Sequence, residues 1–366
     1  MIIMATKKTG ISADLIIHPG ETIADVLDDR NITQLELAQL TNFSSDYVNN
    51  VIHGEKNISA EFAVALEYAL GVPASFWINL QAIYDSEKLE IEKESTITKE
   101  EIQAFHQIKE VIKYLRNIGK MPLGEKIKDA ILSARRALQI SNLCSLNTLT
   151  AEGSFRMATD VSVNYFVMGA WLRICQLRGD KENIITRFDK DKIDTLIDDI
   201  KKIMRNSQDG FQHELKNLMA QYGIDFSLIR HFKGAPVQGY ITKKLDGSYQ
   251  MVLTLRGAFA DIFWFSLFHE LGHIYGGHVS TNVKFIDYSQ ESDMEKSANA
   301  FARNALINET DYKIFVQRGH FDLPSICTFA EEQGVVPYIV IGRLQKQKIL
   351  PYNRYCKEKL RYKWLK

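Results

Sequence analysis

The sequence has few cysteines, no excess of either charge and no long apolar run, and each of these absences excludes a class of protein. Its 366 residues include four cysteines, none of them in a C-x-x-C pair. This pattern indicates reduced thiols and argues against a disulfide scaffold or a cysteine-built zinc site. The 45 Lys and Arg residues balance the 45 Asp and Glu residues, so no global field favours nucleic acid or a membrane surface.

Targeting and spanning signals are also absent from the sequence. No run approaches about 18 uninterrupted apolar residues, and the N-terminus lacks the basic-then-apolar pattern of a secretory signal. We therefore expect a cytoplasmic protein with no membrane partner. The length predicts two or three domains, and no internal repeat or low-complexity tract is visible.

The most informative stretch contains His269-Glu270-Leu271-Gly272-His273, an H-E-x-x-H pattern. On a helix, His269 and His273 share one face and can bind one metal ion, for which zinc is the natural choice. Glu270 lies about 100° further round, where it can act on a water molecule without being a ligand. The preceding run 262–268 is apolar, as a buried helix requires, and Gly276 and Gly277 supply a stop signal.

A third ligand is available in the segment Asp293–Ile307, which has helical apolar spacing. Glu295 begins this segment, and Asn299 lies one turn later on nearly the same face. A carboxylate from a second helix would complete three protein ligands and leave one position open, as catalytic zinc sites require. The side chain of Asn299 can hydrogen-bond one of the ligand histidines without binding the metal itself.

H-E-L-G-H followed by E-x-x-A-N-x-F-A resembles the ImmA/IrrE family of metallopeptidases. The resemblance implies one zinc ion per chain, held by His269, His273 and Glu295, with Glu270 as the catalytic base. One departure is Asn308, where family members often have proline after the A-L-I run. Residue 308 has no role in metal binding or catalysis, so the predicted site is unaffected.

A β-hairpin precedes the H-E-x-x-H helix and suggests the substrate. Asp246-Gly247 is a strong two-residue turn signal between the expected strands 240–245 and 248–255. We expect the second strand to lie beside the helix with an exposed edge, with which an extended peptide can pair. The group that stabilises the oxyanion is not assignable from sequence. Its candidates are Tyr275, His278 and Arg343.

Residues 18–85 have the pattern of five short helices. Thr33, with Glu36 as its capping-box partner, opens the second helix, and Ser44 caps the third. Asn42 between them tolerates the left-handed conformation of a tight turn. Ser59 caps a fourth helix and Pro73 starts a fifth. Two short helices joined by such a turn indicate a helix-turn-helix.

The segments H-P-G-E-T (18–22), 44–59 and F-W-I-N-L-Q-A-I-Y-D (76–85) resemble the HigA-type antitoxins. The resemblance implies a homodimer that binds operator DNA and partners an RNA-cleaving toxin.

The charge of this segment does not favour DNA binding. Residues 1–85 hold four Lys or Arg and eleven Asp or Glu, a net charge of −7, whereas DNA-reading modules are usually basic. The bundle is therefore either an operator reader or a dimerisation and docking module. The candidate DNA contacts are Gln34, Ser45, Tyr47, Asn49, Asn50 and Lys56.

We expect a mainly α fold with a small β-sheet, in the α+β class. The expected divisions are an N-terminal arm (1–17), the helix-turn-helix domain (18–85), a charged linker and helix (86–122), a helical middle region (123–204) and a zincin-like metallopeptidase domain (205–366). In the linker region we expect one helix over 99–117. The motif at 151–156 resembles the linking region of long antitoxin–peptidase fusions.

Three functions are open at this point. The first is a DNA-binding regulator with a zinc endopeptidase that cleaves a repressor or toxin-system component. The second is an antitoxin-like transcription factor whose zinc domain senses or binds with little proteolysis. The third is a structural zinc domain joined to a dimerisation module. Glu270 favours the first over the third, because a structural site needs no base.

Overall fold

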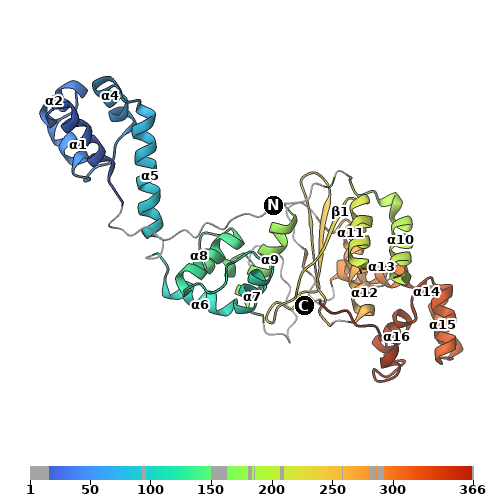
Figure 1. Ribbon diagram of the computed structural model, residues 1–366. Coiled ribbons are helices and arrows are strands. Elements are labelled where there is room, and N and C mark those ends of the chain that lie inside the picture. The colour runs from blue at the N-terminus through green and yellow to red at the C-terminus, as the bar shows by residue number, and fades with distance from the viewer. Residues whose placement is uncertain are drawn as a thin grey trace. The chain divides into compact units, whose positions relative to one another are not determined.

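The computed structural model describes residues 16–92, 96–149, 163–179, 184, 186–206, 210–257, 259–279, 285–286 and 292–364. The chain forms two compact units, Met1–Lys99 and Glu100–Lys366. Helices dominate both units and one small sheet lies in the second (Figure 1), which confirms the expected α+β class. The expected arm, except for residues 16–17, and the motif at 151–156 lie outside the described residues.

The first unit is the expected bundle of five helices. They are α1 (Pro19–Arg30), α2 (Gln34–Thr41), α3 (Ser45–Ile52), α4 (Ala60–Leu70) and α5 (Ala74–Glu92). Thr33 and Glu36 form the predicted capping box. Ser44 accepts from the amide of Tyr47, and Asn42 adopts the left-handed conformation with φ 57°. The helix-turn-helix is therefore built by local signals that the sequence displays.

The H-P-G-E segment joins the start of α1 to the end of α3. The ring of His18 caps α1 by accepting from the amide of Gly20 at 2.9 Å. A Cβ on Gly20 would lie 2.1 Å from the carbonyl oxygen of Val51, so only glycine permits this contact. The motif thus fixes the entry of the chain into the bundle, whose core includes Leu37, Phe62 and Trp77.

The second unit begins with a helix pair where one helix was predicted. The helices are α6 (Lys99–Gln107) and α7 (Lys109–Asn117), and they are separated at Ile108, whose φ is −96° and ψ 23°. The expectation of one helix is wrong at this residue. The side chain of Ile108 is fully buried, and the sequence here has no Gly or Pro that would announce a break.

The helices α8 (Ile127–Leu138), α9 (Tyr165–Gly179) and α10 (Ile193–Asn206) follow, as the expectation of a helical middle region requires. After α11 (Phe211–Gln221), β1 (Ile224–Leu228), β2 (Gly239–Lys243) and β3 (Tyr249–Leu253) enter a four-stranded sheet of order β1-β3-β2-β4. The predicted hairpin is β2 and β3, which pair antiparallel. The parallel strand β1 and the short β4 (Phe285–Ile286) were not predicted.

The expected exposed edge on the second hairpin strand is wrong. β3 lies between β1 and β2, and all five of its residues are buried. On one face, α9 packs through Trp171 against Tyr240 and accepts a hydrogen bond from Gln250 at the carbonyl of Cys175. On the other face lies α12 (Ala260–Tyr275) (Figure 1). Because both faces of the sheet are covered, β3 has no exposed side chain.

The remaining helices are α13 (Asp293–Leu306), α14 (Glu309–Arg318), α15 (Leu323–Glu332) and α16 (Pro337–Lys346). Asn308 caps α14 by accepting from the amides of Thr310 and Asp311, so the residue that replaces the family's proline starts a helix. Among all these described helices, none combines the length and apolar character needed to cross a membrane.

Candidate functional site

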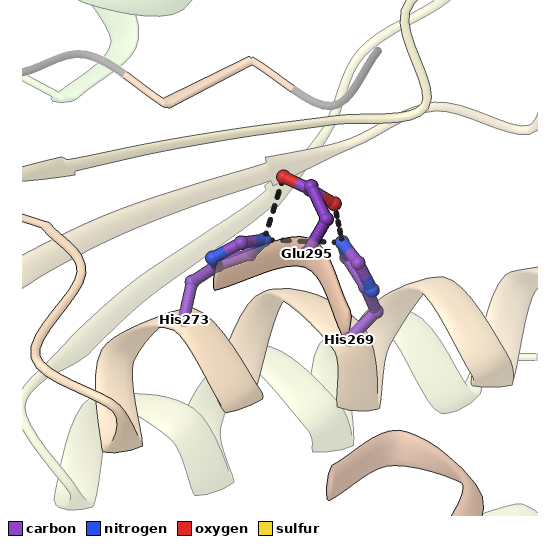
Figure 2. Close-up of side chains that lie close together, drawn as sticks. All are labelled: His269, His273 and Glu295. Atoms are coloured by element: carbon purple, nitrogen blue, oxygen red, sulfur yellow. Dashed lines mark hydrogen bonds and ion pairs between the residues drawn. The ribbon is translucent and has the colours of Figure 1, made fainter. Parts of the chain in front are cut away.

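Three side chains of the kinds that ligate metals meet between α12 and α13. The Nε2 atoms of His269 and His273 lie 3.1 Å apart. The Glu295 carboxylate lies 3.1 Å from Nε2 of His269 and 3.3 Å from Nε2 of His273. Figure 2 shows all three groups pointing toward one another, the histidines from one helix and Glu295 from the other. The sequence pattern therefore identified residues that the fold brings together.

Close packing of α12 against α13 places Glu295 opposite the two histidines. Gly272, between them in sequence, faces Ala298, whose Cα would lie 3.1 Å from a Cβ at Gly272. Small residues at this crossing let the two backbones approach. The other sides of α12 are held by the core, in which Trp264, Leu267 and Leu271 are fully buried. Each such side chain contributes roughly 1.5–3 kcal/mol to folding.

The three donor atoms fit a zinc ion. Zinc–nitrogen and zinc–oxygen bonds of about 2.0–2.2 Å in a tetrahedron require donor atoms roughly 3.3 Å apart, and the observed separations are 3.1 to 3.3 Å. The donor atoms all lie within 4.8 Å of one another. Two imidazoles and one carboxylate also match the donor set of catalytic zinc sites. The residues present therefore suit the metal that the sequence predicted.

Each of the two histidine rings has a polar partner at its Nδ1 atom. Nδ1 of His269 lies 3.1 Å from the Asn299 side-chain oxygen, which accepts from Nδ1–H and leaves Nε2 free of a proton for a metal. Nδ1 of His273 lies 3.0 Å from Nδ1 of His278. Burial and the neighbouring His273 lower the pKa of His278, and a neutral His278 can accept the proton of His273.

The electrostatics of the cluster favour a charged carboxylate. Burial raises the pKa of Glu295, but its close contacts with the His269 and His273 rings lower the pKa by more, and it falls to about 2. Glu295 is therefore ionised at neutral pH, the form in which a carboxylate binds a metal.

Glu270 follows His269 on α12, and its side chain lies against Gly239, the first residue of β2. Its side chain is almost completely buried. A Cβ on Gly239 would lie 1.9 Å from Glu270 Oε1 and 2.5 Å from its carboxyl carbon, so glycine at 239 provides the space that this carboxylate occupies. Beside it, Ser266 on α12 donates to Gln238 at 2.9 Å. The sheet thus positions Glu270.

The three oxyanion candidates have different surroundings. Arg343 donates to the carbonyl of Ile307, packs on Tyr312 and pairs with Glu309, so it belongs to the C-terminal helices. The ring of Tyr275 stacks on Phe301 and is partly exposed. His278 supports His273. Of the three, only His278 contacts the donor cluster among the described residues.

Sequence reasoning missed the roles of His278 and Gly239. A histidine five residues beyond His273 has no helical spacing to reveal it, because α12 ends at Tyr275. In the sequence, Gly239 precedes the first expected strand of the hairpin, and no pattern connects it with Glu270. Both depend on contacts between segments distant in sequence.

The helix-turn-helix residues have two kinds of surroundings. Gln34, Ser45, Asn49 and Lys56 are exposed, and Asn50 is half-buried. Tyr47 is different, because its ring packs on Phe43 and Phe62 at 5.0 and 5.2 Å. Lys56 lies over the outer face of this ring, 5.5 Å from its centroid. The side chain of Tyr47 is therefore shared between the bundle core and the surface.

Comparisons with known proteins agree with this part of the fold. A helix-turn-helix family model matches residues 23–77. Virulence-associated protein I of Dichelobacter nodosus is 30% identical over 80 residues, which are 22% of this chain and 74% of that protein. The chain therefore belongs to the helix-turn-helix family of this relative.

Two solved structures are also similar to part of the chain. An addiction module antidote protein of a HigA family from Coxiella burnetii is 30% identical, over 23% of this chain and 96% of that one, with a TM-score of 0.21. The Pseudomonas aeruginosa antitoxin HigA with the higBA promoter is 31% identical, over 23% of this chain and 97% of that one, with a TM-score of 0.19.

Proposed function

We propose that this chain is a DNA-binding regulator of the antitoxin type whose second unit is a zinc-dependent endopeptidase. Its substrate is a peptide bond in a protein partner, either a repressor or a toxin-system component. The observation that carries the peptidase proposal is the convergence of three donor atoms, with the buried carboxylate of Glu270 directly after His269 on the same helix. A site that only stabilises the fold has no use for this fourth group.

Each residue of the site has a role in this proposal. Zinc, when bound, polarises the scissile carbonyl and makes water acidic enough to lose a proton at neutral pH. Glu270 takes the proton from the water and returns it to the leaving amine. Asn299 and His278 fix the orientation of His269 and His273. The resemblance of these motifs to ImmA/IrrE peptidases supports the same assignment.

The substitution Glu270→Gln tests this chemistry. The variant keeps the size of the side chain and the metal ligands, so it should bind zinc as the wild type does. Cleavage of the partner should fall by about 100-fold or more, because the general base is lost. Full cleavage by the zinc-loaded variant would refute the peptidase mechanism. A zinc-loaded wild type that binds its partner without cleaving it would favour a sensor or interaction domain.

The proposal of DNA binding rests on the first unit. Its family match covers both helices of the helix-turn-helix, and Ser45 and Asn49 are exposed on α3. We propose that α3 reads base edges in operator DNA, with Gln34 at the start of α2 contacting a phosphate. Because the unit is acidic, base contacts must supply an unusually large share of its affinity.

Asparagine changes on α3 test operator binding. Each good base contact contributes about 1–3 kcal/mol of discrimination, so Asn49→Ala with Asn50→Ala should weaken binding to the protein's own promoter by at least about tenfold. Gln39→Ala on α2 is the control, because Gln39 is exposed outside α3. Unchanged gel-shift affinity in the double variant would favour a docking module instead.

Two further assignments belong to the proposal. The four free cysteines fit the cytoplasm. A homodimer fits the apolar side chains that α4 and α5 expose, among them Tyr68 and Ile83. Sedimentation of the full chain measures the second point, and a monomer at micromolar concentration would contradict it.

A further inference from the structure

A groove in the second unit, separate from the metal centre, is formed by α6, α7 and the loop after α7. Its volume is about 430 Å³. Three of its lining residues are apolar, namely Phe105, Ile112 and Leu123. Phe105 and Ile112 are buried, whereas Leu123 is 79% exposed. An apolar floor therefore lies beneath an apolar side chain that is still largely in solvent.

The remaining lining residues are polar, and three of them are cations: Lys109, Lys113 and Arg116, with Asn117 beside them. The cations follow one another at intervals of four and three residues along α7, so they form a stripe on one face. Among the described residues, no carboxylate pairs with any of the three. The groove thus joins an apolar floor to an unneutralised basic wall.

Two carboxylates close in sequence to these cations do not pair with them. Glu110 accepts from the amide of Lys233 at 3.2 Å, and Glu125 accepts from the Ser133 hydroxyl at 2.6 Å. Arg116 is the most constrained of the cations, because its Nε is shielded from solvent and makes no hydrogen bond to a described residue. The Nε itself is closed to the groove, but Arg116 lines the groove, so an anion there would pair with the charge of its guanidinium.

We propose that this groove binds a small anionic amphiphile, a molecule with one carboxylate and an unbranched apolar chain. The carboxylate pairs with Arg116 and Lys113, while the chain covers Phe105, Ile112 and Leu123. The volume lies in the range of small-molecule sites, about 300–1,000 Å³. The cations favour an anion over a neutral apolar molecule, and the apolar floor favours a ligand with an apolar chain over a simple anion. The site is independent of the proposed peptidase and DNA-binding functions.

Calorimetric titration of the full chain with decanoate, below its micelle concentration, tests the proposal. Decanoate should bind at one site per chain. Decanol, which lacks the charge, and acetate, which lacks the chain, should each bind at least about tenfold more weakly, since a charge-assisted hydrogen bond and the apolar contact are each lost. Equal binding of decanol and decanoate would overturn the role of the cations.

Two variants and one control locate the site. Arg116→Gln should weaken decanoate binding by about tenfold. Lys113→Gln should weaken it about two- to fivefold, and Lys113 is exposed, so this change does not threaten folding. Lys128→Gln is the control, because Lys128 is an exposed cation outside the groove and should leave the affinity unchanged.

Other outcomes overturn the proposal. Unchanged decanoate affinity in the double variant of Lys113 and Arg116 would place the ligand elsewhere. No binding of decanoate, together with binding of an acidic amphipathic peptide that the double variant abolishes, would identify the groove as a protein-docking surface instead.

Discussion

The helix-turn-helix unit and the donor cluster of His269, His273 and Glu295 are built in opposite ways. In the first unit, each turn is fixed by residues a few positions apart, such as Thr33 with Glu36 or Ser44 with Tyr47. Around the donor cluster, the partners of α12 come from β2, from α13 and from the segment after the helix. The first arrangement depends on local backbone chemistry. The second arrangement depends on packing between segments that are distant in sequence. A single substitution in one of these segments can therefore disable the proposed site.

The largest expected effect of such a distant change is that of Gly239→Ala. The added methyl would collide with the Glu270 carboxylate and displace the proposed base. A displacement of about 1 Å costs roughly 100-fold in rate, so partner cleavage should fall by that factor while the zinc content stays the same. Thr242→Ala, on the same strand, is the control. Undiminished cleavage by Gly239→Ala would show that β2 does not position Glu270.

A smaller effect is expected when the supporting histidine is removed. His278→Ala deletes the group that contacts Nδ1 of His273, and loss of such a partner typically weakens metal binding about 10–100-fold. Asn299→Ala should act similarly through His269. Competition with a zinc-binding dye measures both affinities. An unchanged affinity in both variants would mean that these contacts do not orient the ligands.

The smallest effect is expected for a local change in the first unit. Ser44→Ala removes the cap of α3 and should destabilise that helix by about 1 kcal/mol. Hydrogen exchange of the α3 amides measures the loss, and zinc affinity should not change. If exchange at α3 is unaltered, the cap does not stabilise this helix. If zinc affinity also falls, the two units are not energetically separate.

The sequence predicted the parts that follow from local rules. The five helices of the first unit, the left-handed Asn42 and the positions of α12 and α13 were each indicated by caps, glycines or apolar spacing. The cluster of His269, His273 and Glu295 was predicted from helical spacing and from a family resemblance, and the fold brings the three together.

The parts that were missed depend on tertiary contacts. The break at Ile108 has no Gly or Pro to indicate it, and it lies at a residue whose side chain is fully buried. The strand β1 and the covered position of β3 follow from parallel pairing, which no periodicity reveals because both faces are buried. His278 and Gly239 owe their roles to the same kind of contact.

The zinc content of the purified full chain tests the central claim most directly. After reconstitution and removal of loosely bound metal, elemental analysis should find about one zinc per wild-type chain and much less in Glu295→Ala. Asp293→Ala, in the first turn of the same helix with its side chain in solvent, should retain the wild-type amount. A wild type without zinc, or a Glu295→Ala variant with a full complement, would contradict the account.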